Sequence, residues 1–193
     1  MRICLELVGQ TPLVQHNIQL ADERNEYKRA IDELTAKRGK DRTDSENAEI
    51  EKLEWFGGLY HDPDVGIYVP SWSIVRCLER GGTLTRQGST VVRALAVMTD
   101  KVPLEYDGPP DPKDLWERPE FRWRTMVGVD RKRVPRMRPI FRRWALSLEA
   151  ELLDDVMNLR DLAEIAARAG RSEGLGDARK LGNGRFMVKV TAA

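Results

Sequence analysis

The chain contains four segments in which apolar and polar positions alternate. In the first, Ile3, Leu5 and Leu7 point one way while the residues between them point the other. This is the pattern of a strand with one buried face. The same alternation recurs three times later in the chain, so we predict strands over residues 2–8, 121–129, 144–152 and 186–190.

Apolar residues at helical spacing predict a second set of elements. Two amphipathic segments lie close together near the N-terminus, joined by a charged link, and indicate a helical hairpin. Glycine pairs and an Asn cap bound the others. The apolar segment 91–98 fits a strand or a helix, and we favour a strand. The predicted helices span residues 25–37, 44–56, about 71–80 and 158–170, with a short strand at 66–69.

The order of these elements indicates an α+β fold. Read as β-α-β-β-α-β, it predicts a ferredoxin-like (RRM-like) core, in which helices cover one face of an antiparallel sheet. We expect a single domain over residues 1–193, with a helical insertion at 22–58 and a long basic β-hairpin. Many RNA-binding modules share this arrangement, although the fold alone does not establish a function.

Composition excludes several classes of protein. The chain has 193 residues, of which 41% are hydrophobic and 33% charged, as in a globular protein. Cys4 and Cys77 stand apart from each other and from the two histidines, so we expect buried thiols, no metal and no cofactor. No apolar run reaches about 18 residues, and the N-terminus lacks the pattern of a secretion signal. These observations predict no membrane association and a cytoplasmic location.

Charge is unevenly distributed along the chain. The net charge is only +1, but the segment Phe121–Arg143 holds nine basic residues and one acid, a net of +8. The rest of the chain therefore sums to −7, with acids concentrated in 44–64 and 100–120. Such separation predicts a positive face that attracts a polyanion or pairs with a neighbouring subunit.

The densest basic segment reads RKRVPRMRPIFRR and runs from Arg131 to Arg143. We expect a projecting hairpin tip there, because two predicted strands flank it and its prolines oppose a helix. Arginine suits phosphate contact and base stacking, and Met137, Ile140 and Phe141 are placed to wedge between bases. The alternatives are pairing with acidic segments of the same chain or a neighbour, or an unused loop. The predicted contacts are Arg131, Lys132, Arg133, Arg136, Arg138, Arg142 and Arg143, joined by Arg122 and Arg124.

A glycine-rich segment, GLGDARKLGNGRF at 174–186, is the second candidate. Glycines permit positive φ and close backbone approach, and such a loop can present amide groups to phosphate. It is neither a Walker loop nor a dinucleotide fingerprint, and a tight structural connection is the alternative. The residues in question are Gly174, Gly176, Gly182 and Gly184, with the cations Arg179, Lys180 and Arg185.

The GLG and GNGRF motifs before the final strand resemble the glycine-rich loop of the RAMP superfamily, the backbone and processing subunits of CRISPR effector complexes. The segment TPLVQHN, which contains Gln15, His16 and Asn17, resembles the turn after their first strand. The resemblance implies a ferredoxin-like fold, sequence-tolerant RNA binding and head-to-tail assembly. A phage or plasmid relative acting on single-stranded DNA would rely on the same physics.

Three functions follow as hypotheses. The first is non-catalytic binding of single-stranded RNA or DNA by a homo-oligomer or a subunit of a nucleoprotein complex. The further contacts expected for it are Gln15, His16 and Asn17, and Arg86 of the polar segment 83–90. Some RAMP processing subunits are metal-independent ribonucleases that use a histidine, which makes His16 a weak catalytic candidate. The third is an assembly protein whose basic loop docks on a neighbouring subunit.

Overall fold

The structure is a computed structural model that describes residues 1–37, 41–129 and 132–193, apart from the side chains of Val129 and Lys132. The chain forms two compact units. Unit 1 comprises residues 1–14, 61–108 and 141–193, and unit 2 comprises residues 15–60 and 109–140.

An antiparallel sheet forms the centre of unit 1. β1 (Arg2–Gly9) lies between β11 (Phe186–Ala192) and β10 (Trp144–Leu152), and β5 (Leu95–Ala96) pairs with the outer side of β10. The strand order is therefore β11-β1-β10-β5, with β7 (Glu105–Tyr106) also paired to β10. The α+β class predicted from the sequence is confirmed.

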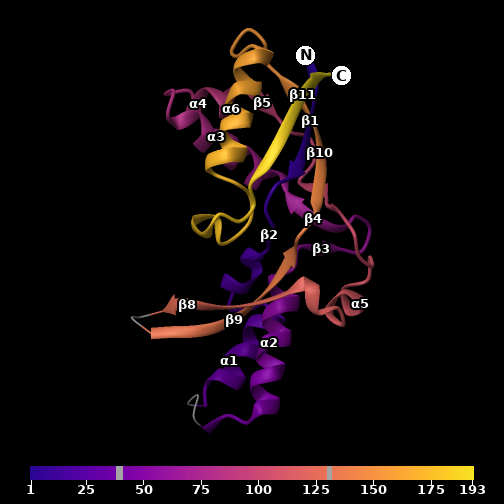
Figure 1. Cartoon of the computed structure of the whole chain (residues 1–193), viewed down its shortest axis with the longest axis vertical. Helices are drawn as coiled ribbons and strands as arrows, with labels where there is room; N and C mark the ends of the chain where they lie inside the picture. The colour runs from indigo at the N-terminus through magenta and orange to yellow at the C-terminus, as the bar shows by residue number, and fades with distance from the viewer. Residues whose placement is uncertain (38–40, 130–131) are drawn as a thin grey trace. The chain divides into compact units, whose positions relative to one another are not determined.

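Helices cover one face of this sheet (Figure 1). α3 (Ser71–Thr83), α4 (Gly88–Ala94) and α6 (Leu159–Ser172) lie on that side. Leu5 and Leu148 are opposite each other in the register and fully buried beneath them. α6 packs so closely on β11 that a Cβ on Gly170 would lie 2.2 Å from the carbonyl oxygen of Phe186. The alternating positions of β1 thus supply the core, as the sequence pattern predicted.

The remaining elements of unit 1 are short. β3 (His61–Asp62), β4 (Gly66–Pro70) and β6 (Lys101–Pro103) form a separate antiparallel sheet. β2 (Leu13–Val14) follows β1 and bridges to Asp177 in the glycine-rich loop, which also contains the 3-10 turn η4 (Arg179–Leu181).

Unit 2 is built on a helical hairpin and a β-hairpin. α1 (Glu26–Thr35) packs against α2 (Asp44–Gly58), and η1 (Ile18–Ala21) precedes them. Asn25 caps α1, and Thr43 with Glu46 forms a capping box at α2, which are local signals for helix starts. α5 (Pro112–Trp116) and η3 (Pro119–Phe121) lead into β8 (Arg122–Val129) and β9 (Lys132–Phe141).

The core of unit 2 centres on Trp55 of α2. Its side chain is fully buried, and its Nε1 donates a hydrogen bond of 2.8 Å to the carbonyl oxygen of Phe121. Phe56 and Trp116 pack against the ring with centroid distances of 5.0 and 5.5 Å. This aromatic cluster joins α2 to α5 and to the start of β8.

The pairing of the basic segment differs from the prediction. We expected a loop at 131–143 between strands 121–129 and 144–152, but residues 132–141 are themselves a strand that pairs with β8. Pro135 and Pro139 are compatible with this strand because the backbone nitrogens of residues 135, 137 and 139 point away from β8. The backbone N–H of Met137 shows this direction, since it donates to Glu54 and not to β8. The ladder to β8 therefore loses no donor.

The favoured strand at 91–98 is also wrong for most of its length. Residues Gly88–Ala94 form α4, and only Leu95 and Ala96 are extended. Val91 and Ala94 are buried while Val92 between them is half exposed, which is the spacing of a helix. An apolar run of this length suits a strand equally well, so the sequence alone did not distinguish the two.

Candidate nucleic-acid interface

The β8–β9 hairpin divides its arginines between two faces. Residues opposite each other in an antiparallel pair share a face. Arg138 lies opposite Trp123, and Arg136 lies opposite Thr125, so both arginines belong to one face. The other face carries Arg122, Arg124 and Arg133, the last being opposite Gly128.

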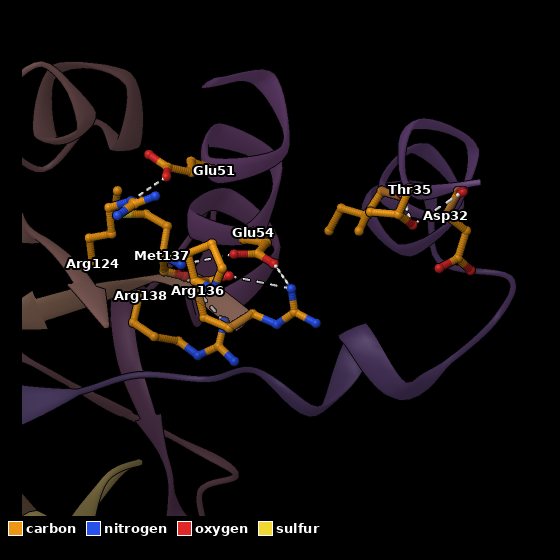
Figure 2. Close-up of polar contacts among 10 residues, drawn as sticks. Asp32, Thr35, Glu51, Glu54, Arg124, Arg136, Met137 and Arg138 are labelled. Atoms are coloured by element: carbon orange, nitrogen blue, oxygen red, sulfur yellow. Dashed lines mark hydrogen bonds and ion pairs between the residues drawn. The ribbon is translucent and has the colours of Figure 1, made fainter. Parts of the chain in front are cut away.

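Carboxylates of α2 already pair with two of these arginines (Figure 2). Glu54, whose side chain is 5% exposed, accepts hydrogen bonds from Arg136 Nη1 at 2.9 Å and from the backbone N–H of Met137 at 2.8 Å. Burial raises the pKa of Glu54, while the Met137 N–H and the two nearby arginines oppose that shift. Arg124 Nε lies 2.6 Å from Glu51 Oε1. Two of the predicted nucleic-acid contacts, Arg124 and Arg136, are therefore already paired with carboxylates of the same unit.

The other cations of the segment differ in their surroundings. Arg143 Nη2 lies 3.0 Å from Asp107 Oδ2 in an exposed pair, and the Arg122 guanidinium lies over the Trp116 ring, 4.9 Å from its centroid. Arg138 is only 7% exposed.

Two described cations of the segment are both exposed and outside any described ion pair. Arg133 and Arg142 are exposed and form no ion pair with any side chain that the structure describes. Arg131 and the side chain of Lys132 lie outside the described part. The accessible basic surface is thus smaller than the sequence suggested.

The apolar residues expected to wedge between bases are buried instead. Met137, Ile140 and Phe141 are 7%, 3% and 0% exposed, respectively, and belong to the core. The exposed apolar residues of the hairpin lie on β8, where Met126 is 48% and Val127 36% exposed.

The cluster after β1 has a mainly structural role. The buried Gln15 accepts a hydrogen bond of 2.9 Å from the backbone N–H of Tyr60 through Oε1. Asn17 caps η1 and donates from Nδ2 to the carbonyl oxygen of Leu59 at 3.0 Å. His16 is exposed and lines a pocket of unit 2. His16 is thus the most exposed of the three, Asn17 is half-buried and Gln15 is buried.

The glycine-rich loop has a tightly constrained backbone. All four of its predicted glycines have positive φ, between 73° and 87°. A Cβ on Gly176 would lie 2.2 Å from the Val14 carbonyl oxygen, and one on Gly184 would lie 1.9 Å from that of Leu175. Gly174 is similarly enclosed, whereas Gly182 faces open space. Packing therefore explains three glycines, and the left-handed turn alone explains the fourth.

This loop forms a cationic pocket of about 410 Å³ at the end of α6. Arg179, Lys180 and Arg185 line it together, as the sequence predicted, and Arg80 from the last turn of α3 joins them. Sequence reasoning missed Arg80 because nothing local connects α3 to the loop. With Glu173 and Asp177 also at the pocket, its lining side chains carry four positive and two negative charges.

Arg185 has an unusual environment in this pocket. Its Nη2 donates to the carbonyl oxygen of Arg179 at 3.3 Å, but its Nη1 is buried and makes no hydrogen bond within the described ranges. A buried charged donor without a partner costs about 1–3 kcal/mol or more. Arg86, in contrast, is exposed in the turn between α3 and α4 with a φ of 59° and does not line the pocket.

The open face of the unit 1 sheet does not resemble a base-stacking platform. Its exposed positions include Glu6 on β1 and Glu149 and Glu151 on β10. Every residue of these strands and of β11 is described, and no aromatic side chain lies on that face. RRM-type recognition uses sheet aromatics to stack bases, so this mode does not apply to this sheet.

Two further features are absent from the described residues. No group of three or more His, Cys, Asp or Glu side chains is placed to hold a metal ion. No helix in the described ranges has the length and hydropathy needed to span a membrane.

Comparisons with known proteins found similarity to solved structures. No family model matches the chain, and no curated protein matches it in sequence. The crystal structure of Cmr6 from Pyrococcus furiosus aligns over 97% of this chain and 97% of its own, with 11% sequence identity and a TM-score of 0.39. At this identity and TM-score, the similarity supports no conclusion about family or function, and both depend on the residues of this chain.

Proposed function

We propose that the protein binds single-stranded RNA or DNA through its phosphate backbone, without reading sequence, at the glycine-rich loop of unit 1. The observation that carries this proposal is the buried Nη1 of Arg185, which no described group satisfies, in a pocket where three other cations gather. A phosphate oxygen would supply the missing acceptor, and the flat guanidinium suits bidentate contact.

The balance of charge in the pocket supports a polyanion as the ligand. Four cations and two carboxylates leave an excess of two positive charges. Arg179 and Lys180 lie in η4, where Lys180 is exposed and Arg179 partly so, so both can approach a backbone from solvent. Binding phosphates there would release counterions, which makes the affinity depend steeply on salt.

The hairpin of unit 2 supports contact with a strand but not base-specific readout. Arg133 is exposed on the same face as Met126, which is 48% exposed. Exposed apolar and cationic side chains in alternation suit sequence-tolerant contact with bases and backbone. We propose this face as a second contact surface that lies within unit 2 and is independent of the loop.

The fold and family are part of the same proposal. The order β11-β1-β10-β5, with α3 and α4 between β1 and β5 and with α6 between β10 and β11, supports a ferredoxin-like core. The motifs that resemble those of the RAMP superfamily, GLG and GNGRF, are the same segments that shape the cationic pocket. We therefore propose a RAMP-like, non-catalytic subunit that assembles along the strand.

A double substitution tests the site. Arg179→Ala with Lys180→Ala removes two cations that hold no carboxylate in the described structure, so the fold should survive. Losing two phosphate contacts should lower the salt slope of log K by about 1.4, which is about 25-fold in affinity near 0.1 M salt. Fluorescence anisotropy with labelled oligo-uridine and oligo-thymidine measures both quantities.

The matched control is Arg93→Ala with Arg160→Ala. These exposed residues lie on α4 and α6 of the same unit and do not line the pocket. Replacing them removes the same positive charge as the test variant. If both double variants bind like the wild type, or lose affinity equally, the glycine-rich loop is not the site.

One observation favours a second candidate, RNA cleavage. His16 shares a unit 2 pocket with Glu54 and Arg136, a set of side chains that suits acid–base chemistry on a phosphodiester. Labelled RNA incubated in EDTA with wild type and with His16→Ala tests it, and wild type that leaves the RNA intact removes this candidate.

A further inference from the structure

Unit 2 contains a pocket of about 560 Å³ that lies entirely within that unit. One face of α1 forms one wall, with residues at helical spacing, and alternate residues of β9 form another. The segment before α1, Arg42 just before α2, and Glu54 within α2 complete it. The lining residues are His16, Leu20, Lys28, Ile31, Asp32, Thr35, Lys37, Arg42, Glu54, Val134, Arg136 and Arg138.

Positive charge predominates in this pocket. Five of the lining side chains are cationic and two are carboxylates, which leaves an excess of three. Lys28 pairs with Asp32, so this carboxylate is already engaged. Lys37 pairs with Glu46, which does not line the pocket, so this outside carboxylate lowers the excess to two. An anion is therefore the ligand that the pocket's charge favours.

Arg42 has a buried donor whose hydrogen-bonding capacity is not used. Its Nε is buried, yet it has no hydrogen-bond partner in the part of the chain that the structure describes. No carboxylate depends on Arg42 for its charge balance in the described ion pairs. Burying such a donor is unfavourable unless an acceptor arrives.

Glu54 positions a second arginine at the same pocket. It holds Arg136 Nη1 at 2.9 Å, and in Figure 2 the guanidinium extends beyond Glu54 toward the side where Asp32 and Thr35 of α1 lie. The Arg136 side chain is 28% exposed, so its other nitrogens remain accessible. A guanidinium fixed by a buried carboxylate is preorganised for a second, ligand-borne acceptor.

The pocket is not only polar. Leu20, Ile31 and Val134 contribute apolar surface beside the cations. A volume of this size holds a small organic ligand, not just a single ion. The combination fits a ligand with a phosphate at one end and a flat or apolar body at the other.

We propose that this pocket binds a nucleoside phosphate, with the phosphate at Arg42 and Arg136 and the base or sugar against Leu20, Ile31 and Val134. The ligand is a free mononucleotide or the phosphorylated end of a strand, which present the same chemistry. This site is separate from the glycine-rich loop, and the proposal holds whether or not that loop binds a strand.

Titration calorimetry with the whole chain tests the proposal. AMP should bind, and adenosine, which lacks the phosphate, should bind at least about tenfold more weakly. Arg42→Ala should weaken AMP binding by about tenfold or more, since it removes a charge-assisted hydrogen bond. Thr35→Glu, which places a carboxylate at an exposed position of the pocket wall, should have a similar or larger effect.

Arg29→Ala is the matched control, because Arg29 is an exposed cation of α1 that does not line the pocket. It should bind AMP like the wild type. Circular dichroism confirms that each variant is folded.

Short oligonucleotides with and without a 5′-phosphate identify the source of the ligand. A preference for the phosphorylated form that Arg42→Ala abolishes supports a strand end, and AMP binding that Arg42→Ala weakens supports a mononucleotide. The proposal is overturned if wild type binds neither AMP nor the phosphorylated end preferentially. It is equally overturned if Arg42→Ala and Thr35→Glu leave the binding unchanged.

Discussion

The ion pair between Glu51 and Arg124 allows a gain-of-function test of the hairpin. The pair is short, at 2.6 Å, but its side chains are 27% and 59% exposed, and surface pairs of this kind contribute at most about 1 kcal/mol to stability. Glu51→Gln should therefore leave the fold intact. It would release Arg124 on the hairpin face that also carries Arg133.

The size of the effect follows from polyelectrolyte behaviour. If a nucleic-acid strand lies along this face, the released arginine can take one additional phosphate. One more contact steepens the salt slope of log K by about 0.7 for a single strand, which is about fivefold in affinity near 0.1 M salt. The expected change is an increase in affinity, which impaired folding would not produce.

Anisotropy titrations of a labelled oligo-uridine over a series of salt concentrations measure the slope and the affinity together. Glu33→Gln is the control, because Glu33 is an exposed residue of α1 in the same unit and its substitution changes the net charge equally. Equal behaviour of the two variants would refute the reasoning, since it would show that only net charge matters and that the hairpin face does not contact the strand.

Three further predictions concern stability and reactivity. Gly176→Ala should lower the free energy of unfolding by about 2 kcal/mol or more, whereas Gly182→Ala, with the same left-handed φ but open space, should cost about 1 kcal/mol; urea denaturation distinguishes them, and equal costs would contradict the packing argument. Because the pKa of Glu54 is raised above its ordinary value of 4.5, its contribution to stability should be greatest in acid and should fall as pH rises through the folded pKa. Glu54→Gln, which does not titrate, should lack this pH dependence, and unfolding curves between about pH 4 and pH 8 measure it. If the stability of the wild type relative to Glu54→Gln rose with pH, the predicted sign would be wrong. Burial raises the pKa of Cys77 to about 12, so a thiol reagent should modify the half-buried Cys4 in the native protein and reach Cys77 only on unfolding.

Elements defined by local signals were predictable from the sequence. The alternation around Leu5 and the cap at Asn158 each involve neighbours in the chain, and the structure places both as expected. The glycine-rich loop was located correctly for the same reason, since its motifs lie within one short segment. Strand pairing was less accessible, because the alternation in 121–129 shows that a strand exists but not which strand lies beside it.

The site was only partly predictable because it depends on contacts between distant residues. Arg136 and Glu54 are 82 positions apart, and no periodicity connects them. Arg80 reaches the loop pocket from another helix, and Arg42 becomes a candidate only because its buried Nε has no described partner. Sequence reasoning identifies residue types, whereas burial and pairing decide which of them a ligand can reach.

Local charge density and available charge are different quantities in this protein. Residues 132–140 of the densest basic segment belong to unit 2. The acidic helix α2 belongs to the same unit, and its Glu51 and Glu54 pair with Arg124 and Arg136. The less conspicuous cations of the glycine-rich loop include a guanidinium nitrogen that is buried without a hydrogen bond. An unsatisfied buried donor raises the energy of the free protein and is relieved when an anion binds, whereas a paired arginine must first give up its carboxylate. The loop is therefore expected to dominate affinity, and the hairpin to contribute in proportion to how easily its carboxylates are displaced.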